Sequence, residues 1–157
     1  MEKNYSEAIK LFDKSIKIKP DFWQAINNQG LAYFEKNNIN LSIKLFEKAI
    51  SFQEHAEPLL GLASCLRVKD IESARQLAKK ALAKNPNYVN YDYRKEQLWG
   101  ERLQKSTIIL LQNDQIKTDV ILAKTKINAS SYFCILVNLC LPISLNLVNQ
   151  YMFNFAL

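Results

Sequence analysis

One pattern of large and small apolar residues recurs three times in the first half of the chain. The segment YSEAIKLFDKSI at residues 5–16 aligns with INLSIKLFEKAI at residues 39–50, which lies 34 positions later. A third copy, residues 71–82, lies 32 positions further on and keeps alanine or leucine in most of the same slots. A period of this length is typical of arrays in which each unit packs on its neighbours. The spacing therefore predicts a repeat protein.

Each repeat is predicted to contain two helices. On both sides of a polar break at residues 36–38, apolar or small residues recur at three- and four-residue steps: Trp23, Ile26, Gly30 and Tyr33 before it, and Ile39, Ser42, Phe46 and Ala49 after it. Each helix must bury its stripe, and the other helix of the pair is the nearest surface. Residues 21–54 are therefore expected to form an antiparallel helical hairpin.

The period, the two helices per unit and the prolines that close the first and third copies, Pro20 and Pro86, resemble the tetratricopeptide repeat (TPR) family. Gly30 stands in the small slot of the family's first helix. Gln29 and Glu54 depart from the family pattern. The resemblance implies an all-α fold, a short right-handed superhelix of TPR-like helical hairpins.

The boundaries follow from the repeat and from composition. We expect a repeat domain over residues 1–113, a linker over residues 114–126 and an apolar tail over residues 127–157. The repeat domain divides into a half repeat at 1–20, repeats at 21–54 and 55–86, and a capping helix at 87–113.

The first unit is incomplete in this pattern. Residues 5–18 correspond to the second helix of a repeat, and no first helix precedes them in the sequence. Part of their apolar stripe, Ala8, Phe12 and Ser15, then lacks its usual cover. We favour a fragment of a longer array, and the alternatives are self-association or cover by the C-terminus.

In TPR proteins, partner peptides usually lie on the concave surface that the first helices form. The resemblance places five candidate partner-binding residues there, followed by Glu57 and Gly61: Gln24, Asn27, Asn28, Leu31 and Glu35. Side-chain amides can pair with a peptide backbone, and a leucine can supply an apolar pocket. The alternative is that Asn27 and Asn28 are merely exposed polar residues. Glu57 and Gly61 replace the basic residues of the subset that grips chaperone C-termini, so such tails are not expected as partners.

Composition favours a binding protein over an enzyme. The formal charge is +6, but the lysines of the second helices alternate with acids, as on a solvated surface, so nucleic-acid binding is not favoured. His55 is the only histidine, no phosphate loop or nucleophile motif is present, and Cys65 is expected to be packed. We therefore expect no catalytic residue, cofactor, metal or small-molecule substrate.

The cysteine content and the polar N-terminus predict a cytoplasmic location, because three cysteines leave an odd thiol and no apolar leader is present. Residues 127–157 carry no charged side chain, and residues 130–150 are long enough to cross a bilayer. A membrane anchor, a helix packed on the array and an unrelated tail remain open for this segment. The predicted function is a TPR adaptor or scaffold that binds a peptide or protein segment. The alternatives are a membrane-tethered assembly factor and a nucleic-acid-binding array.

Overall fold

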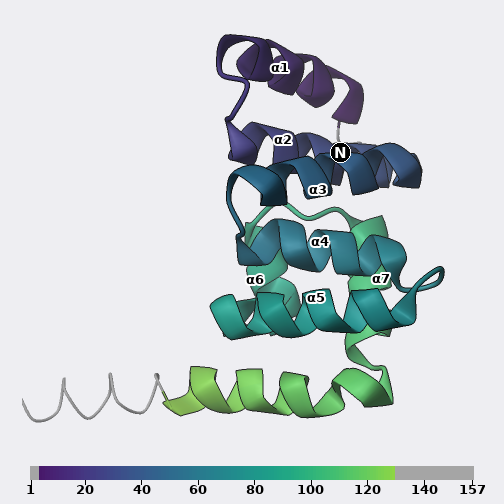
Figure 1. Cartoon of the computed structure of the whole chain (residues 1–157), viewed down its shortest axis with the longest axis vertical. Coiled ribbons are helices and arrows are strands. Elements are labelled where there is room, and N and C mark those ends of the chain that lie inside the picture. The colour runs from purple at the N-terminus through teal and green to yellow at the C-terminus, as the bar shows by residue number, and fades with distance from the viewer. Residues whose placement is uncertain (1–3, 130–157) are drawn as a thin grey trace, which may run out of the picture.

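The computed structural model describes residues 4–129, and every regular element in that range is helical. Consecutive helices stack on one another along the first two thirds of this range (Figure 1). They are α1 (Tyr5–Ile18), α2 (Trp23–Glu35), α3 (Ile39–Phe52), α4 (Ala56–Leu66) and α5 (Ile71–Lys84). The expected all-α helical-repeat fold is confirmed for the described residues.

The residues that precede the second helices of the three units also follow the repeat. The side-chain oxygens of Asn4, Asn38 and Asp70 each accept the backbone N–H three residues on, at 3.1, 3.3 and 3.0 Å. These side chains satisfy N–H groups that have no partner within the helix. They begin α1, α3 and α5, which are the second helices of the three units.

The core of the central repeat forms around Phe46, which is fully buried. A Cβ atom added to Gly30 of α2 would lie 3.1 Å from the Phe46 ring, and one added to Gly61 of α4 would lie 2.7 Å from it. The Ser42 hydroxyl of α3 also donates to the Gly30 carbonyl at 2.8 Å. The small residues thus allow three helices to meet at one ring, which confirms the predicted register.

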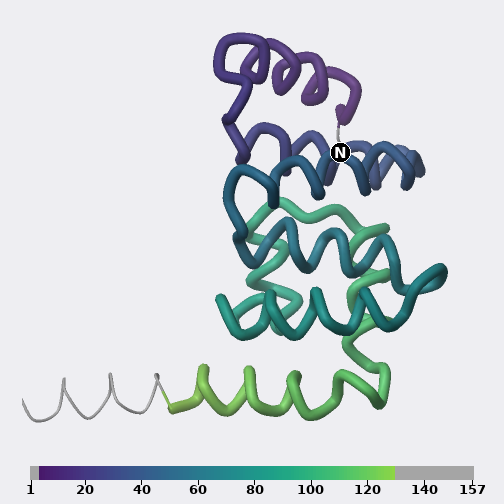
Figure 2. Tube along the Cα trace, viewed as in Figure 1, coloured from purple at the N-terminus to yellow at the C-terminus, as the bar shows by residue number. Residues whose placement is uncertain are grey.

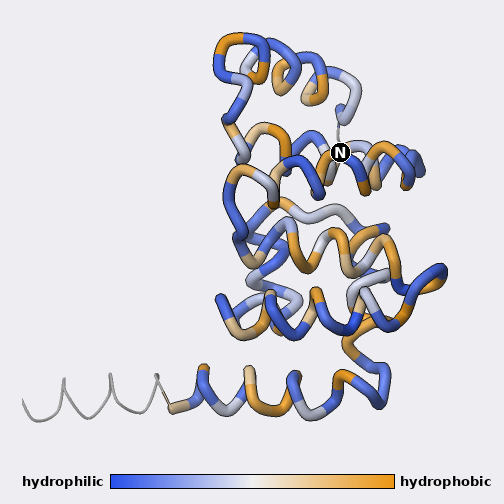
Figure 3. Tube along the Cα trace, in the orientation of Figure 1, coloured by the Kyte–Doolittle hydropathy of each residue, from blue (hydrophilic) through white to orange (hydrophobic). Residues whose placement is uncertain are grey.

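The helix α4 is the most continuously buried element of the stack. Every residue from position 58 to position 65 is buried, and most of this stretch is coloured as hydrophobic (Figure 3). This composition fits its position, because α3, α5 and α7 (Glu101–Leu111) all pack against it.

The predicted capping helix over residues 87–113 is not continuous. A 3₁₀ turn η1 (Pro86–Val89) is followed by α6 (Tyr91–Glu96) and then by α7. Between them Leu98 has a φ of 64°, and the N–H groups of Leu98 and Trp99 donate to the carbonyls of Lys95 and Arg94. This is the Schellman arrangement that ends a helix, usually with glycine at the position of Leu98. The break was missed because leucine carries no turn signature.

Residues 114–126, predicted to be a linker, are instead mostly helical. A 3₁₀ turn η2 (Asp114–Ile116) leads into a helix over residues 117–129. Ile116 is fully buried, Ala123 is nearly so, and η2 packs against α5. This segment therefore covers the far end of the array in place of a flexible connection.

The alternatives for the apolar tail fall outside the described residues, which end at residue 129. This includes the stretch 130–150 that was considered as a membrane anchor. Within residues 4–129, no helix combines the length and the apolar character needed to cross a membrane.

Candidate partner-binding site

The C-terminal segment folds back over the first helices of the repeats. In the view of Figure 2, α6 and α7 lie behind α4 and α5, and α7 packs against both α4 and α2. The hydroxyls of Ser64 in α4 and Thr107 in α7 are 2.7 Å apart, and the Ser106 hydroxyl donates to the Ser64 carbonyl at 2.8 Å. The part of the expected concave surface that α4 contributes is therefore covered by the chain itself.

Glu35 fixes the beginning of α7. Its carboxylate oxygens accept the backbone N–H groups of Arg102 at 3.1 Å and Leu103 at 2.9 Å. The residue preceding α7, Gly100, has no side chain to cap the helix, and a Cβ there would overlap the Glu35 carboxylate. A carboxylate at a helix N-terminus is favoured by hydrogen bonding and by the helix dipole. Glu35 thus has an intramolecular role that the sequence did not reveal.

Glu57 connects three parts of the fold from a largely buried position. Its carboxylate accepts the Trp99 indole N–H and the Asn27 amide N–H, both at 2.8 Å. Burial raises the pKa of Glu57, and these two hydrogen bonds oppose the increase. Asn27 is fully buried, and its Oδ1 has no hydrogen-bond partner within residues 4–129. Asn27 is therefore not on the open surface where the sequence placed it.

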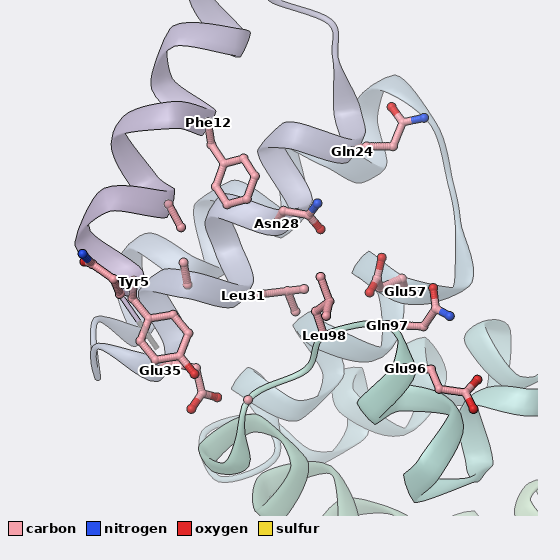
Figure 4. A pocket seen from close by; sticks show the side chains of 14 residues that line it. Tyr5, Phe12, Gln24, Asn28, Leu31, Glu35, Glu57, Glu96, Gln97 and Leu98 are labelled. Atoms are coloured by element: carbon pink, nitrogen blue, oxygen red, sulfur yellow. The ribbon is translucent and has the colours of Figure 1, made fainter. Parts of the chain in front are cut away.

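The other four predicted residues line one pocket of about 540 Å³, which we call the α1–α2 pocket (Figure 4). The contribution of α2 is Gln24, Asn28, Leu31, Ala32 and Glu35. Opposite them, from the start of the chain and α1, are Asn4, Tyr5, Ala8 and Phe12. Glu57 of α4, Glu96 at the end of α6 and three residues of the α6–α7 connection complete the pocket: Gln97, Leu98 and Gly100. A volume of this size is ordinary for ligand sites.

Apolar side chains from three separate elements meet in this pocket. Figure 4 shows Phe12, Leu31 and Leu98 in the pocket, from α1, α2 and the α6–α7 connection. Leu98 is 77% exposed, and its backbone adopts a conformation that leucine rarely tolerates. Leu98 was not among the predicted site residues, and the nearest sequence signal of a break in the helix is Gly100, two residues later.

The charged residues of the pocket are all acidic. Glu35, Glu57 and Glu96 line it, with no lysine, arginine or histidine among the lining residues. The ion pairs found within residues 4–129 involve none of these three carboxylates. The pKa of Tyr5 is raised by burial and then by the negative charges of Glu35 and Glu101. The pocket is therefore locally negative in a chain whose net charge is positive.

A buried cysteine and a second cavity lie outside the α1–α2 pocket. Cys65 is buried, and burial raises the pKa of its thiol to about 12, which confirms the expectation of a packed cysteine. A second cavity of about 610 Å³ lies beside Trp23 and His55, whose rings stack at 4.1 Å. Gln24 alone among the predicted partner-binding residues lines that cavity.

A comparison with models of protein families found a match over the central hairpin. Residues 24–55 match the model of the tetratricopeptide repeat. The hairpin of α2 and α3 is a tetratricopeptide repeat. A search of curated proteins found no match to the chain. TPR units are in general protein–protein interaction modules without catalytic activity, and this TPR supplies one wall of the α1–α2 pocket.

Proposed function

We propose that this chain is a non-catalytic TPR adaptor that binds a peptide or protein segment in the α1–α2 pocket. The observation that carries the proposal is the pocket itself, which combines four residues predicted from the TPR pattern with an exposed leucine from outside the repeats. Gln24 and Asn28 offer amides for hydrogen bonds, while Leu31 and Leu98 offer apolar surface.

The chemistry of the pocket supports a protein partner over a nucleic acid. Three carboxylates line the pocket and no lysine or arginine does, so the pocket repels phosphate groups, which nucleic-acid sites attract with lysine and arginine. Tyr5 and Phe12 supply aromatic surface, but the charge beside them has the wrong sign for a phosphate backbone.

A peptide-display selection on the full-length chain tests the proposal. Selected peptides should lose affinity by about tenfold or more when Asn28→Ala and Leu98→Asn are combined, because central apolar contacts dominate such interfaces. The matched control is Lys44→Ala with Lys48→Ala, at two exposed positions of α3 outside the pocket. Loss of binding only in the lysine variant would move the site to the other face, and binding unaffected by either variant would remove the pocket from the interface.

Leu98 is preferred over Leu31 as a target because Leu31 is buried, and its truncation would also destabilise the fold. Circular dichroism of both variants checks that helicity is retained.

A membrane-tethered form of the same adaptor is a separate proposal, and it rests on the absence of charged residues from position 127 to position 157. Fractionation of the full chain against a form ending at Lys126 tests it. Recovery of both forms in the same fraction contradicts the tether.

A further inference from the structure

The helices α1 and α3 occupy equivalent positions in successive repeats, but other helices cover α1 less completely than α3. Phe46 in α3 is fully buried because α2 packs on one side of it and α4 on the other. Its equivalent in α1, 34 positions earlier, is Phe12, which is only partly buried and faces the α1–α2 pocket. Within residues 4–129, α2 is the only helix that packs extensively on α1.

The central repeat shows what type of element covers such a face. The helix α2 places Gly30 against Phe46 and accepts the Ser42 hydroxyl at the Gly30 carbonyl, 2.8 Å away. The equivalent positions in α1 are Phe12 and Ala8, and both line the pocket. Leu11 corresponds to Leu45, whose Cβ would lie 3.4 Å from a Cβ added to Gly30, and Leu11 is 53% exposed. The exposed face of α1 therefore corresponds to the face of α3 that packs against α2.

The pocket also places a requirement on the charge of its occupant. Glu57 and Glu96 line the same pocket as Phe12 and Leu98, so an occupant that contacts these two apolar residues lies beside two carboxylates. Neither carboxylate has an ion-pair partner in the described part of the chain. Glu57 is largely buried, so its negative charge is poorly screened by solvent. A lysine or arginine on the occupant would compensate this charge.

We propose that the occupant of the α1–α2 pocket is an amphipathic α-helix of a protein partner, which packs on α1 as α2 packs on α3. The helix presents a small residue to Phe12, apolar residues to Leu11 and Leu98, and a basic side chain to Glu57 and Glu96. This inference rests on the proposed function and specifies its ligand. It corresponds to recognition by apolar anchors at three- and four-residue spacing along one helix face.

The chain supplies its own template for a probe. A fluorescent, hydrocarbon-stapled peptide with the sequence of residues 21–36 reproduces α2, and lysines replace Asn28 and Glu35 in it to supply positive charge. Its binding to the full-length chain is measured by fluorescence anisotropy at low ionic strength. We expect saturable binding that weakens at least tenfold when the peptide carries Gly30→Phe, because a bulky ring there cannot approach Phe12.

The charge requirement is tested with a second peptide and a matched pair of protein variants. A peptide with glutamate in place of the two lysines should bind about tenfold more weakly. Glu96→Lys in the protein should weaken the lysine peptide by about threefold or more, since exposed ion pairs contribute modestly. Glu47→Lys makes the same charge change at an exposed position of α3 outside the pocket and should have a smaller effect.

The outcomes separate this inference from the proposed function. If display-selected peptides bind through Asn28 and Leu98 while the stapled peptide does not bind, the helical occupant is wrong and the adaptor function stands. If Gly30→Phe binds equally well, packing on Phe12 is wrong. Equal binding of the lysine and glutamate peptides overturns the charge requirement. Failure of both the stapled and the selected peptides to depend on the pocket overturns both proposals.

Discussion

Leu98 adopts a backbone conformation that glycine or asparagine would adopt at lower cost. Its φ of 64° completes the Schellman turn after α6, and the equivalent turn after α2 uses Asn37, with a φ of 63°. A β-carbon in this region costs about 1–2 kcal/mol. The leucine side chain contributes little to folding because it is 77% exposed. The residue is therefore unfavourable for stability, and its side chain lies in the proposed site.

Replacing Leu98 should separate stability from binding. We expect Leu98→Asn to raise the free energy of unfolding by about 0.5–1 kcal/mol, because asparagine tolerates positive φ. The same variant should weaken ligand binding because the pocket loses an apolar side chain. Urea denaturation and anisotropy measure the two effects. Unchanged affinity in a stabilised protein would exclude Leu98 from the site.

The raised pKa of Glu57 predicts that the stability of the fold depends on pH. Burial raises its pKa, so the folded state binds this proton more tightly than the unfolded state does. The penalty of the buried charge is therefore present at neutral pH and disappears as pH falls through the raised pKa toward the ordinary value of about 4.3.

We expect Glu57→Gln to be at least as stable as the wild type at neutral pH. The glutamine oxygen can still accept from Trp99, and its amide can donate to Asn27 Oδ1 once the Asn27 amide turns over. The stability of the variant relative to the wild type should then decrease as pH falls. Urea denaturation across this pH range measures the free energy of unfolding of both proteins. A variant that becomes more stable relative to the wild type as pH falls would contradict the raised pKa of Glu57.

At the scale of single elements, the two equivalent phenylalanines differ in cover. Phe46→Ala should cost about 3–5 kcal/mol, because a fully buried ring leaves a cavity between α2, α3 and α4. Phe12→Ala is the matched control and should cost about 1–2 kcal/mol, because its ring is only partly buried. Thermal and urea unfolding measure both. An equal loss of stability in the two variants would contradict the conclusion that Phe12 is less covered than Phe46.

The junction of α2 and α7 is testable by a double-mutant cycle. Glu35→Ala should cost about 1–2 kcal/mol, because the N–H groups of Arg102 and Leu103 lose their acceptor. Gly100→Ala should have a similar effect because the added Cβ displaces the Glu35 carboxylate. In a Glu35→Ala background the glycine substitution should then cost little. Additive effects would show that Gly100 acts independently of Glu35.

The elements that sequence reasoning recovered are those with an apolar stripe in a repeating register. The helices α1 to α5 and the burial of Phe46 follow from spacing, because each stripe must face a neighbouring helix. The segment after η1 does not repeat. Its break depends on a leucine at positive φ, which no propensity indicates, so the sequence predicted one helix in place of α6 and α7.

The candidate site was predictable only in part for the same reason. Of the five residues of α2 that came from the TPR resemblance, four line the pocket. Asn27 was misplaced because adjacent helix positions point about 100° apart, and its side toward Glu57 is buried. The wall that includes Leu98 comes from a non-local contact between the C-terminal segment and the repeats, which a periodic pattern does not describe.

At the scale of the whole molecule, the C-terminal segment determines how much of the repeat surface is open. It closes the part over α4 through Trp99, Thr107 and Ser106, and it forms a wall of the pocket that remains beside α1 and α2. The central claim is that a partner binds in this pocket while α6 and α7 stay in place.

Hydrogen–deuterium exchange of the full-length chain, with and without a saturating display-selected peptide, tests this claim most directly. We predict slower exchange with peptide in residues 4–12, 24–35 and 96–100, and unchanged exchange in α7 after its first turn. Faster exchange throughout α6 and α7, together with protection of α4, would contradict the claim, because it would show that the partner displaces the C-terminal segment.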